Sequence, residues 1–573
     1  MPKSEIKITI DGKSVGASLG QSILEVASAN GIFLPSLCQH PDLSVKANCR
    51  VCVVEIKGQT HLATSCSTPV KAGMEIFTNS PRVQKSRDLN IKLLFSEHIE
   101  KCANCTLRYN CALLDLARRY KIKITSFPDR KGQRKTCKLA NAVEIDGTQC
   151  IDCRNCIEAC SNIQKINYLE LKGKGINQEV VPTANKDIDC IYCGQCTLHC
   201  PVAAAQEQDD WSAVEKLLAD KNKIVVAQFA PSVRVTIGEE FGLPYDEKST
   251  GRTVTALKKL GFQHVFDVNF SADVTTMVEA QELLERLGDK KATLPMITSC
   301  CPAWVKYVEF FHPELIPNLT TARSPQIHLG GIIKTFWADK MKLNPKQIVV
   351  VSIMPCTAKK FESRRQEMKV KGLYPVDYVL TTREFGFLLK KNNIDFQKLK
   401  PSASDKIFNE GSGAAVIYGS SGGVMESALR TAYALVCRDG LAKFCNSRID
   451  FKEVRGLEEI KEAVIDLAGK KLRVAVVNGI GVIDQVLDNL KKYDYIEVMA
   501  CPGGCIGGGG QPIPTTAEIR KTRVAALYQI DKFKEIRKAH DNKEVIEVLD
   551  WLKAKKIDHS VLHTKYQKRA RSK

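Results

Sequence analysis

CIDCRNCIEAC at residues 150–160 decides the fold of the middle of this chain, together with its repeat CIYCGQCTLHCP at residues 190–201. Each stretch has the cysteine spacing C-x2-C-x2-C-x3-C, which suits a pair of cubic 4Fe–4S clusters. In such pairs the fourth cysteine of one stretch binds the cluster of the other stretch. We therefore predict a ferredoxin-like domain over residues 140–210. Its predicted ligand sets are Cys150, Cys153, Cys156 and Cys200 for one cluster, and Cys190, Cys193, Cys196 and Cys160 for the other.

The rest of the chain is also unusually rich in cysteine. The 573 residues include 23 cysteines, and 16 of these lie before residue 201. Dense disulfide frameworks belong to small secreted domains, whereas this chain is long enough for several domains. Its beginning, MPKSEIKITIDGKSV, has no apolar signal core, and no apolar run reaches the length of a membrane-spanning helix. We therefore expect a cytoplasmic protein without a membrane span, whose clustered cysteines bind metal.

The first cysteine group predicts a 2Fe–2S domain over residues 1–80. Ile6, Ile8 and Ile10 alternate with polar residues, and Asp11-Gly12 marks a turn before a second strand and a helical pattern. This order predicts a β-grasp domain whose loops surround a rhombic cluster. The candidate ligands are Cys38, Cys49, Cys52 and Cys66. Zinc held by the same sulfurs is the alternative. The spacing resembles the N-terminal domain shared by the large iron–sulfur subunit of complex I and its relatives.

A histidine joins the second cysteine group, in the sequence FSEHIEKCANCTLRYNC at residues 95–111. His98 and Cys102 are four residues apart and share one face if this segment is helical. We predict a 4Fe–4S module over residues 81–125 with the ligands His98, Cys102, Cys105 and Cys111. A neutral imidazole in place of one thiolate makes such a site less negative and raises its reduction potential. A Cys3His zinc site competes with this interpretation on ligand type.

From about residue 220 the pattern changes to buried strands that alternate with amphipathic helices. Apolar runs such as KIVVAQF at residues 223–229 and QIVVVSI at residues 347–353 predict α/β layers with a parallel sheet. In such folds, functional sites gather at the carboxyl ends of the strands. Three apolar runs end in cysteine-containing segments: TSCCP at residues 298–302, MPCTAKK at residues 354–360 and MACPGGC at residues 499–505. These segments predict a further cluster site in an α/β domain over residues 220–573.

Together, TSCCP, MPCTAKK and MACPGGC resemble the three signatures of iron-only (FeFe) hydrogenases, and the order of the N-terminal modules extends the resemblance over the whole chain. The resemblance implies a multidomain α+β and α/β protein whose last domain holds the H-cluster, a 4Fe–4S cubane joined to a two-iron unit. That unit carries carbonyl, cyanide and azadithiolate ligands and is installed by maturation proteins. The implied cubane ligands are Cys301, Cys356, Cys501 and Cys505, of which Cys505 also bridges to the two-iron unit. One 2Fe–2S cluster and three accessory 4Fe–4S clusters complete the implied set of cofactors.

The resemblance also implies a proton relay that starts at Cys300. Glu279, Glu282 and Arg286 stand at helical spacing in MVEAQELLERL and share one face of the expected helix. Thr320 occupies the hydroxyl position of the relay, where serine is usual in the family. The implied wall of the two-iron pocket comprises Ala230, Pro231, Ser232, Gln326, Met354, Lys359, Tyr418 and Met499, with Tyr418 where phenylalanine is common.

The implied activity is the reversible conversion of two protons and two electrons into H2. A hydrogen-sensing member of the family and a non-catalytic electron-transfer subunit are the alternatives, and the retained Cys300 and cysteine motifs favour catalysis. QFAPSVRVTIGEEFGLP at residues 228–244 and TTARSP at residues 320–325 look closer to the catalytic subunits of NAD(P)-linked, sometimes electron-bifurcating, hydrogenases. The expected electron partner is therefore ferredoxin or flavodoxin, or separate flavin- and NAD(P)-binding subunits, since no dinucleotide-binding fingerprint is identified in the sequence.

The charge of the chain is strongly basic. Its formal net charge of +20 comes from 84 Lys and Arg and 64 Asp and Glu residues that are mixed along the sequence. The one concentrated basic segment is the end, KYQKRARSK at residues 565–573, so we expect no nucleic-acid partner. A basic surface steers an acidic electron-carrier protein or simply keeps the protein in solution, and the sequence leaves both interpretations open.

Overall fold

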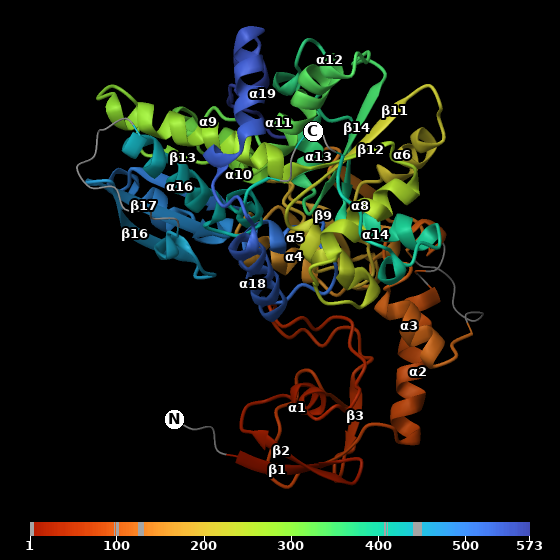
Figure 1. The fold of residues 1–573 in the computed structure, drawn as a ribbon. Coiled ribbons are helices and arrows are strands. Elements are labelled where there is room, and N and C mark those ends of the chain that lie inside the picture. Colours follow the sequence, from red (N-terminus) through yellow and green to blue (C-terminus); the bar gives the residue numbers. More distant parts are fainter. Residues whose placement is uncertain are drawn as a thin grey trace.

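A small N-terminal domain lies below a larger body, and a pair of helices connects the two (Figure 1). The computed structural model describes residues 5–96, 98, 102–123, 131–405, 408, 411–438 and 450–572. The connecting helices are α2 (Pro81–Ser96) and α3 (Ala112–Arg119). Arg87 of α2 is buried and donates hydrogen bonds to the carbonyl oxygens of Val51 and Val53, at 3.0 and 2.9 Å. These bonds fix the direction in which α2 leaves the N-terminal domain.

The N-terminal domain is a mixed five-stranded sheet with the strand order β2-β1-β5-β3-β4. Its elements are β1 (Glu5–Ile10), β2 (Lys13–Ser18), α1 (Ile23–Ala29), β3 (Val53–Ile56), β4 (Ala63–Thr64) and β5 (Glu75–Phe77). Ser22 and Glu25 form a capping box that begins α1. Ile8 and Ile10 of β1 share one core with Val26 of α1. The alternation read from the sequence thus places one face of β1 against the helix and confirms the expected β-grasp arrangement.

The ferredoxin-like domain contains a repeated unit of a turn and a short helix. α4 (Asn155–Glu158) follows Arg154 at a φ of 65°, and α5 (Gln195–Leu198) follows Gly194 at a φ of 71°. A Cβ atom on Gly194 would lie 2.4 Å from Oγ1 of Thr357, so glycine lets this unit approach the body closely. The strands are β6 (Thr136–Leu139), β7 (Val143–Asp146), β8 (Leu169–Lys172), β9 (Glu179–Pro182) and β10 (Ala205–Glu207).

Two four-stranded sheets form the core of the body. One, in the order β12-β11-β14-β15, is parallel throughout, and Ala227 of β11 pairs with Val351 of β14. The other, in the order β13-β18-β17-β16, is parallel except for its edge strand β16. The strands are β11 (Ile224–Phe229), β12 (His264–Asp267), β13 (Met296–Ile297), β14 (Ile348–Met354), β15 (Tyr378–Thr381), β16 (Ile460–Leu467), β17 (Lys470–Asn478) and β18 (Tyr495–Met499). The predicted α/β layers are confirmed.

Helices pack against both sheets and also between them. The main ones are α8 (Ser249–Leu260), α9 (Val268–Gly288), α10 (Pro302–Phe311), α11 (Pro325–Ile332), α14 (Thr382–Lys391), α16 (Gly423–Arg438), α18 (Ala517–Phe533) and α19 (Lys543–Ala554). The short helix η10 (Ile417–Gly419) lies next to the start of α16. Among the described residues, none of the helices combines the length and the apolar composition needed to cross a membrane.

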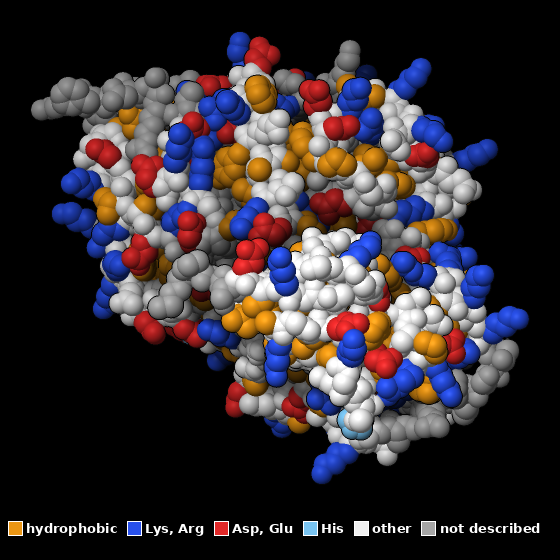
Figure 2. Space-filling model, turned by 90° about the horizontal axis from the view of Figure 1, so that it is seen from below, with side chains coloured by type: hydrophobic (Ala, Val, Ile, Leu, Met, Phe, Trp, Pro, Cys, Tyr) orange, Lys and Arg blue, Asp and Glu red, His pale blue; other side chains and the backbone are white. Residues whose placement is uncertain are grey.

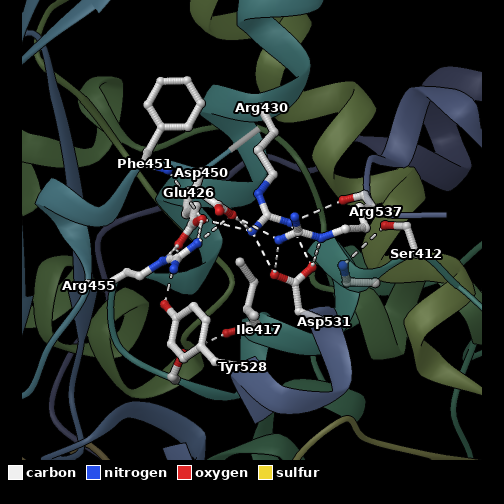
Figure 3. Close-up of polar contacts among 12 residues, drawn as sticks. Ser412, Ile417, Glu426, Arg430, Asp450, Phe451, Arg455, Tyr528, Asp531 and Arg537 are labelled. Atoms are coloured by element: carbon white, nitrogen blue, oxygen red, sulfur yellow. Dashed lines mark hydrogen bonds and ion pairs between the residues drawn. The ribbon is translucent and has the colours of Figure 1, made fainter. Parts of the chain in front are cut away.

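A buried group of charges joins α16 to α18 (Figure 3). Arg430 of α16 binds both carboxylate oxygens of Asp531 at 2.8 Å and also binds Glu426 at 2.8 Å. Arg455 and Arg537 extend the group, because Arg455 donates to Glu426 at 2.7 Å and Arg537 to Asp531 at 2.8 Å. Each buried acid thus contacts two guanidinium groups, which compensates the cost of removing the charges from water.

The basic C-terminal segment packs against the body and the ferredoxin-like domain. Arg569 binds Glu309 at 2.9 Å, and Arg571 donates a hydrogen bond to the carbonyl oxygen of Thr183. Ser572 donates from its backbone and its side chain to Asp189. On the face that Figure 2 shows, Lys and Arg side chains are interspersed with Asp and Glu and do not form one continuous basic patch.

Candidate cluster sites and active site

The first cysteine group lies on loops that flank β3 and β4. Cys38, Cys49, Cys52 and Cys66 are all buried. The Sγ atoms of Cys52 and Cys66 are 3.4 Å apart, and the backbone N–H of Cys49 points at Cys38 Sγ at 3.5 Å. The hydrogen bond to Cys38, burial and the Cys38 charge raise the pKa of Cys49. Four such thiolates repel one another, so their ionised form needs a cationic metal centre between them.

The second group faces a pocket beside the ferredoxin-like domain. His98, Cys102 and Cys105 line this pocket, and Cys111 caps the start of α3 close to them. His98 Nδ1 donates a hydrogen bond of 2.7 Å to the carbonyl oxygen of Gln149, because a carbonyl only accepts. Nε2 of the neutral ring therefore keeps its lone pair for a metal. Burial, the largest influence, raises the pKa of Cys105 to about 12, and the charges of Cys111 and Cys102 add to this.

The ferredoxin-like repeats exchange their fourth cysteines in space. Cys150, Cys153, Cys156 and Cys200 line one cavity, although Cys200 belongs to the second repeat. Burial raises the pKa values of Cys190, Cys193 and Cys196, and the charge of Cys160, from the first repeat, adds to this. Backbone N–H groups point at four of these sulfurs at 3.3 Å: those of Cys150, Cys160, Cys190 and Cys200. Such N–H donors stabilise charge on cluster sulfurs.

The cysteine groups follow one another through the protein. Asn48, next to Cys49, donates a hydrogen bond of 3.3 Å to the carbonyl oxygen of Asp152, next to Cys153, so the first group lies next to the first ferredoxin-like site. At the other end, Cys501 Sγ lies 3.9 Å from the carbonyl oxygen of Cys193. The second ferredoxin-like site is therefore in contact with a cysteine that follows β18.

The carboxyl ends of β11, β14 and β18 and the segment after β13 meet at one cavity. Five cysteines line it: Cys300, Cys301, Cys356, Cys501 and Cys505. The residues named from the sequence for the two-iron pocket line the same cavity: Ala230, Pro231, Ser232, Gln326, Met354, Lys359, Tyr418 and Met499. The structure thus brings together residues from six separate stretches of the sequence: 230–232, 300–301, 326, 354–359, 418 and 499–505.

Polar groups on the cavity wall suit an anionic guest. Ser232 Oγ and Gln326 Oε1 are buried and have no hydrogen-bond partner among the described residues. Lys359 Nζ donates to the carbonyl oxygen of Cys300 at 3.0 Å and binds Glu362 at 2.8 Å. Burial opposes the charge on Lys359, but Glu362 and the nearby thiolates outweigh it and raise the Lys359 pKa. An ammonium group, the free hydroxyl of Ser232 and several cysteines fit an iron–sulfur cofactor with anionic ligands.

The carboxylates named for the proton relay all lie on α9. Glu282 binds Arg286 at 2.6 Å and accepts a hydrogen bond of 2.8 Å from Thr320 Oγ1. The extra methyl group of Thr320 therefore does not prevent its hydroxyl from donating to Glu282. Thr321 also donates to Glu282, at 2.9 Å from its hydroxyl. Thr321 was not predicted from the sequence, where its position next to Thr320 is the only signal for it.

Glu279 lies deeper in the protein than Glu282 and is 1% exposed. Burial is the main cause that raises its pKa to about 8, while a hydrogen bond from Tyr495 lowers it. Burial raises the Cys300 pKa well above its usual range, and the charge of Glu279 raises it further. Tyr495 was also missed by the sequence analysis. Every residue of β18 is buried, so the strand offers no alternation that would mark this side chain.

Four family models match the chain, in the order of the domains. They are described as a 2Fe-2S iron-sulfur cluster binding domain (residues 3–81), a 4Fe-4S dicluster domain (149–204), the iron only hydrogenase large subunit, C-terminal domain (223–509) and an iron hydrogenase small subunit (517–569). The large-subunit match includes all five cavity cysteines.

Whole-chain relatives agree with these matches. The chain is 40% identical to the NADP-reducing hydrogenase subunit HndD of Solidesulfovibrio fructosivorans, over 99% of this chain and 100% of that protein. It is 37% identical to iron hydrogenase 1 of Clostridium pasteurianum, over 98% of this chain and 100% of that protein. A solved variant of the FeFe hydrogenase HydA1 from Chlamydomonas reinhardtii is 36% identical, with a TM-score of 0.55 over 62% of this chain and 98% of that chain.

The fold, the cavity and these matches define an iron–sulfur oxidoreductase with a 2Fe–2S domain, a 4Fe–4S dicluster domain and a catalytic H-cluster domain. The chain belongs to the iron-only (FeFe) hydrogenase family. It is an enzyme of that family, and the matches favour this over a non-catalytic electron-transfer subunit or a hydrogen sensor.

Proposed function

We propose that this hydrogenase interconverts protons and H2 in the cavity at the ends of β11, β14 and β18, and exchanges electrons through its N-terminal domains. The observation that carries the proposal is the meeting of five cysteines, Lys359 and two unpartnered polar atoms on one cavity wall. When bound there, the H-cluster supplies the iron at which H2 is formed or split. We assign its cubane to Cys301, Cys356, Cys501 and Cys505.

The residues of the chain then have separate tasks. Lys359 and Ser232 hold the anionic ligands, Gln326 forms part of the wall, and the apolar side chains of Met354 and Met499 exclude water from the cavity. Cys300 exchanges a proton between the cavity and Glu279, whose charge adds to the effect of burial on the Cys300 thiol. The path continues through Thr320, Glu282 and Arg286, which are joined by hydrogen bonds of 2.6–3.1 Å.

We propose one 2Fe–2S cluster on the first cysteine group and three accessory 4Fe–4S clusters on the following groups. The His98 group and the first cysteine group both lie next to the ferredoxin-like site of Cys150, Cys153, Cys156 and Cys200, since His98 binds Gln149 and Asn48 binds the carbonyl oxygen of Asp152. Electrons from either outer cluster would therefore reach the active site through the same pair of cubanes.

For the electron partner, we propose separate flavin- and NAD(P)-binding subunits, with ferredoxin or flavodoxin as the alternative. Support comes from the relative HndD, whose name describes it as a subunit of an NADP-reducing hydrogenase. NADP-linked exchange would also place the enzyme in the cytoplasm, where maturation proteins would install the two-iron unit. Copurification from the native source tests this proposal. Recovery without flavin-bearing subunits, together with reduction by ferredoxin alone, would favour the alternative.

The central experiment is anaerobic cluster reconstitution and maturation, followed by a hydrogen-evolution assay with a reduced viologen. We expect robust H2 evolution by the parent and none by Cys505→Ser, whose cubane and two-iron unit would lose their shared ligand. Iron content and infrared bands of the carbonyl and cyanide ligands confirm loading. A fully loaded parent that evolves no H2 would refute the proposed function.

A further inference from the structure

The two oxygens of Glu279 have different surroundings. Tyr495, at the start of β18, donates a hydrogen bond of 2.7 Å from Oη to Glu279 Oε1. Glu279 Oε2 is buried and has no hydrogen-bond partner among the described residues. Oε1 is therefore held by a donor, whereas Oε2 is free to exchange a proton with a neighbouring group.

This asymmetry decides where Glu279 carries its hydrogen. A carboxylic acid has one O–H and one carbonyl oxygen, and the carbonyl oxygen is the better acceptor for a phenol. Because the Tyr495 hydrogen points at Oε1, the hydrogen of protonated Glu279 belongs on Oε2. The same contact favours the ionised form, since a hydrogen bond to a carboxylate stabilises its charge.

Tyr495 does not itself extend the relay. It is fully buried, and within the described part of the chain its hydroxyl has a hydrogen bond only with Glu279. Burial raises the pKa of Tyr495 well above its usual range, so the phenol keeps its proton at any working pH. A group that keeps its proton and has a single partner can orient a carboxyl group but cannot pass a proton onward.

Other charged and titratable groups also lie near Glu279 and interact with it through their charge. They are Glu282 and Arg286 on α9 itself, Glu497 on β18, Cys300 after β13 and Tyr418 on η10. Glu497 is held by the backbone N–H groups of Gly422 and Met425, both at 2.7 Å. Tyr418 Oη is hydrogen-bonded to Thr276 at 2.9 Å. None of these groups donates a hydrogen bond to the Glu279 carboxyl group in the described structure, whereas Tyr495 does.

We propose that Tyr495 is a positioning residue of the proton relay: it holds Glu279 Oε1 and so directs the exchangeable proton to Oε2. The inference rests on the proposed role of Glu279 in the relay. Loss of the Tyr495 hydroxyl removes a donor that stabilises the carboxylate, so the Glu279 pKa rises. In H2 oxidation, Glu279 accepts protons as the carboxylate, and the pH at which this activity develops therefore moves upward with the pKa.

The test compares the matured parent with Tyr495→Phe, which removes one hydroxyl and leaves the ring in place. Infrared difference spectra recorded against pH report the C=O stretch of the protonated carboxyl group, and its disappearance in Glu279→Gln identifies the band. We expect the midpoint of this titration to rise by about one pH unit in Tyr495→Phe. The lower-pH limb of the H2-oxidation profile should move upward by a similar amount.

Tyr493→Phe is the matched control. Tyr493 also donates its hydroxyl to a carboxylate, that of Glu462, but this pair lies on the edge of the sheet, away from the cavity lining. We expect this variant to keep the parent titration and the parent activity profile. An unchanged carboxyl midpoint in Tyr495→Phe would overturn the inference, as would an equal shift in the control.

The same measurements separate this inference from the proposed function. A shifted carboxyl midpoint with an unshifted H2-oxidation profile would overturn the positioning role while leaving hydrogenase activity in place. A loaded parent without any H2 turnover would instead refute the proposed function, and the relay role of Glu279 and Tyr495 with it.

Discussion

Cys300 and Cys301 are neighbours in sequence, line the same cavity and are assigned different tasks. Cys301 begins α10 as its N-cap residue and is assigned to the cubane. Cys300 is partly buried on the cavity wall, which favours its thiol form, and the charge of Glu279 adds to this effect. A neutral thiol beside a buried carboxyl group is suited to passing protons without leaving an isolated charge in the interior.

Replacing Cys300 by Ala should therefore stop proton delivery and leave the clusters intact. We expect normal iron content and normal infrared bands, with turnover lower by about 100-fold or more, because a positioned acid–base group typically contributes 10²–10⁴-fold. Cys137→Ala on β6 is the control, since Cys137 lies outside the cavity lining. Parent-like turnover in a loaded Cys300→Ala variant would contradict the proposed proton path.

Thr320 offers a second test at the scale of one residue. Its hydroxyl donates to Glu282 at 2.8 Å, and valine has nearly the same shape without a hydroxyl. Thr320→Val should lower H2 turnover by about 100-fold, whereas Thr320→Ser should retain parent-like rates. Measurement of kcat in both directions checks this. Equal rates for the valine and serine variants would show that protons bypass Thr320.

At the scale of elements, the position of α16 depends on its charge contacts with α18. Arg430 is fully buried between Glu426 and Asp531, and both acids keep a second arginine (Figure 3). These contacts fix the start of α16, and the preceding η10 carries Tyr418 to the cavity wall. A local charge cluster thus sets the shape of one side of the active site.

Arg430→Met should destabilise this pair of helices. It leaves two buried acids with fewer partners, a change that typically costs about 3–5 kcal/mol, and we expect the lower end because Arg455 and Arg537 remain. The thermal unfolding midpoint of the matured protein should fall by several degrees. Lys398→Met, which removes a surface ion pair with Asp395, is the control and should leave the midpoint unchanged. A parent-like midpoint for Arg430→Met would show that the cluster does not hold α16 against α18.

At the scale of the whole molecule, Asp189 connects three distant stretches of the chain. Its carboxylate binds Lys306 of α10 at 2.6 Å and accepts both hydrogen bonds from Ser572 of the C-terminal segment. Its other oxygen accepts from the backbone N–H of Cys190 at 2.8 Å. One side chain therefore ties a proposed cluster ligand to the body and to the C-terminal segment.

Asp189→Asn should loosen all three connections, because it leaves Lys306 as a buried charge without its partner. Removal of one partner from a buried ion pair typically costs about 3–5 kcal/mol. We expect a lower thermal midpoint and faster proteolytic loss of the C-terminal segment. Lys568→Met, at an exposed position of the same segment, is the control. Equal protection of the segment in both variants would contradict this role of Asp189.

Much of the fold and most of the proposed ligands follow from local sequence. Cluster ligands at fixed spacing are readable because a cluster binds residues that a short loop brings together. The buried strands are readable because parallel strands between helices are apolar throughout. The apolar run before TSCCP, at residues 294–297, forms a strand only at Met296–Ile297. Pro295 has no N–H to donate to the neighbouring strand, which explains the shorter pairing.

The sequence by itself determined the order of the domains, the cysteine groups and, through resemblance, the wall of the active-site cavity. Only the tertiary structure revealed the contacts of Tyr495 and Thr321 and the attachment of the C-terminal segment to Asp189. Tyr495 and Glu279 are 216 residues apart, and Ser572 and Asp189 are 383 residues apart. Spacing along the chain encodes ligands that share a loop, whereas a hydrogen bond between distant elements exists only after those elements have packed together.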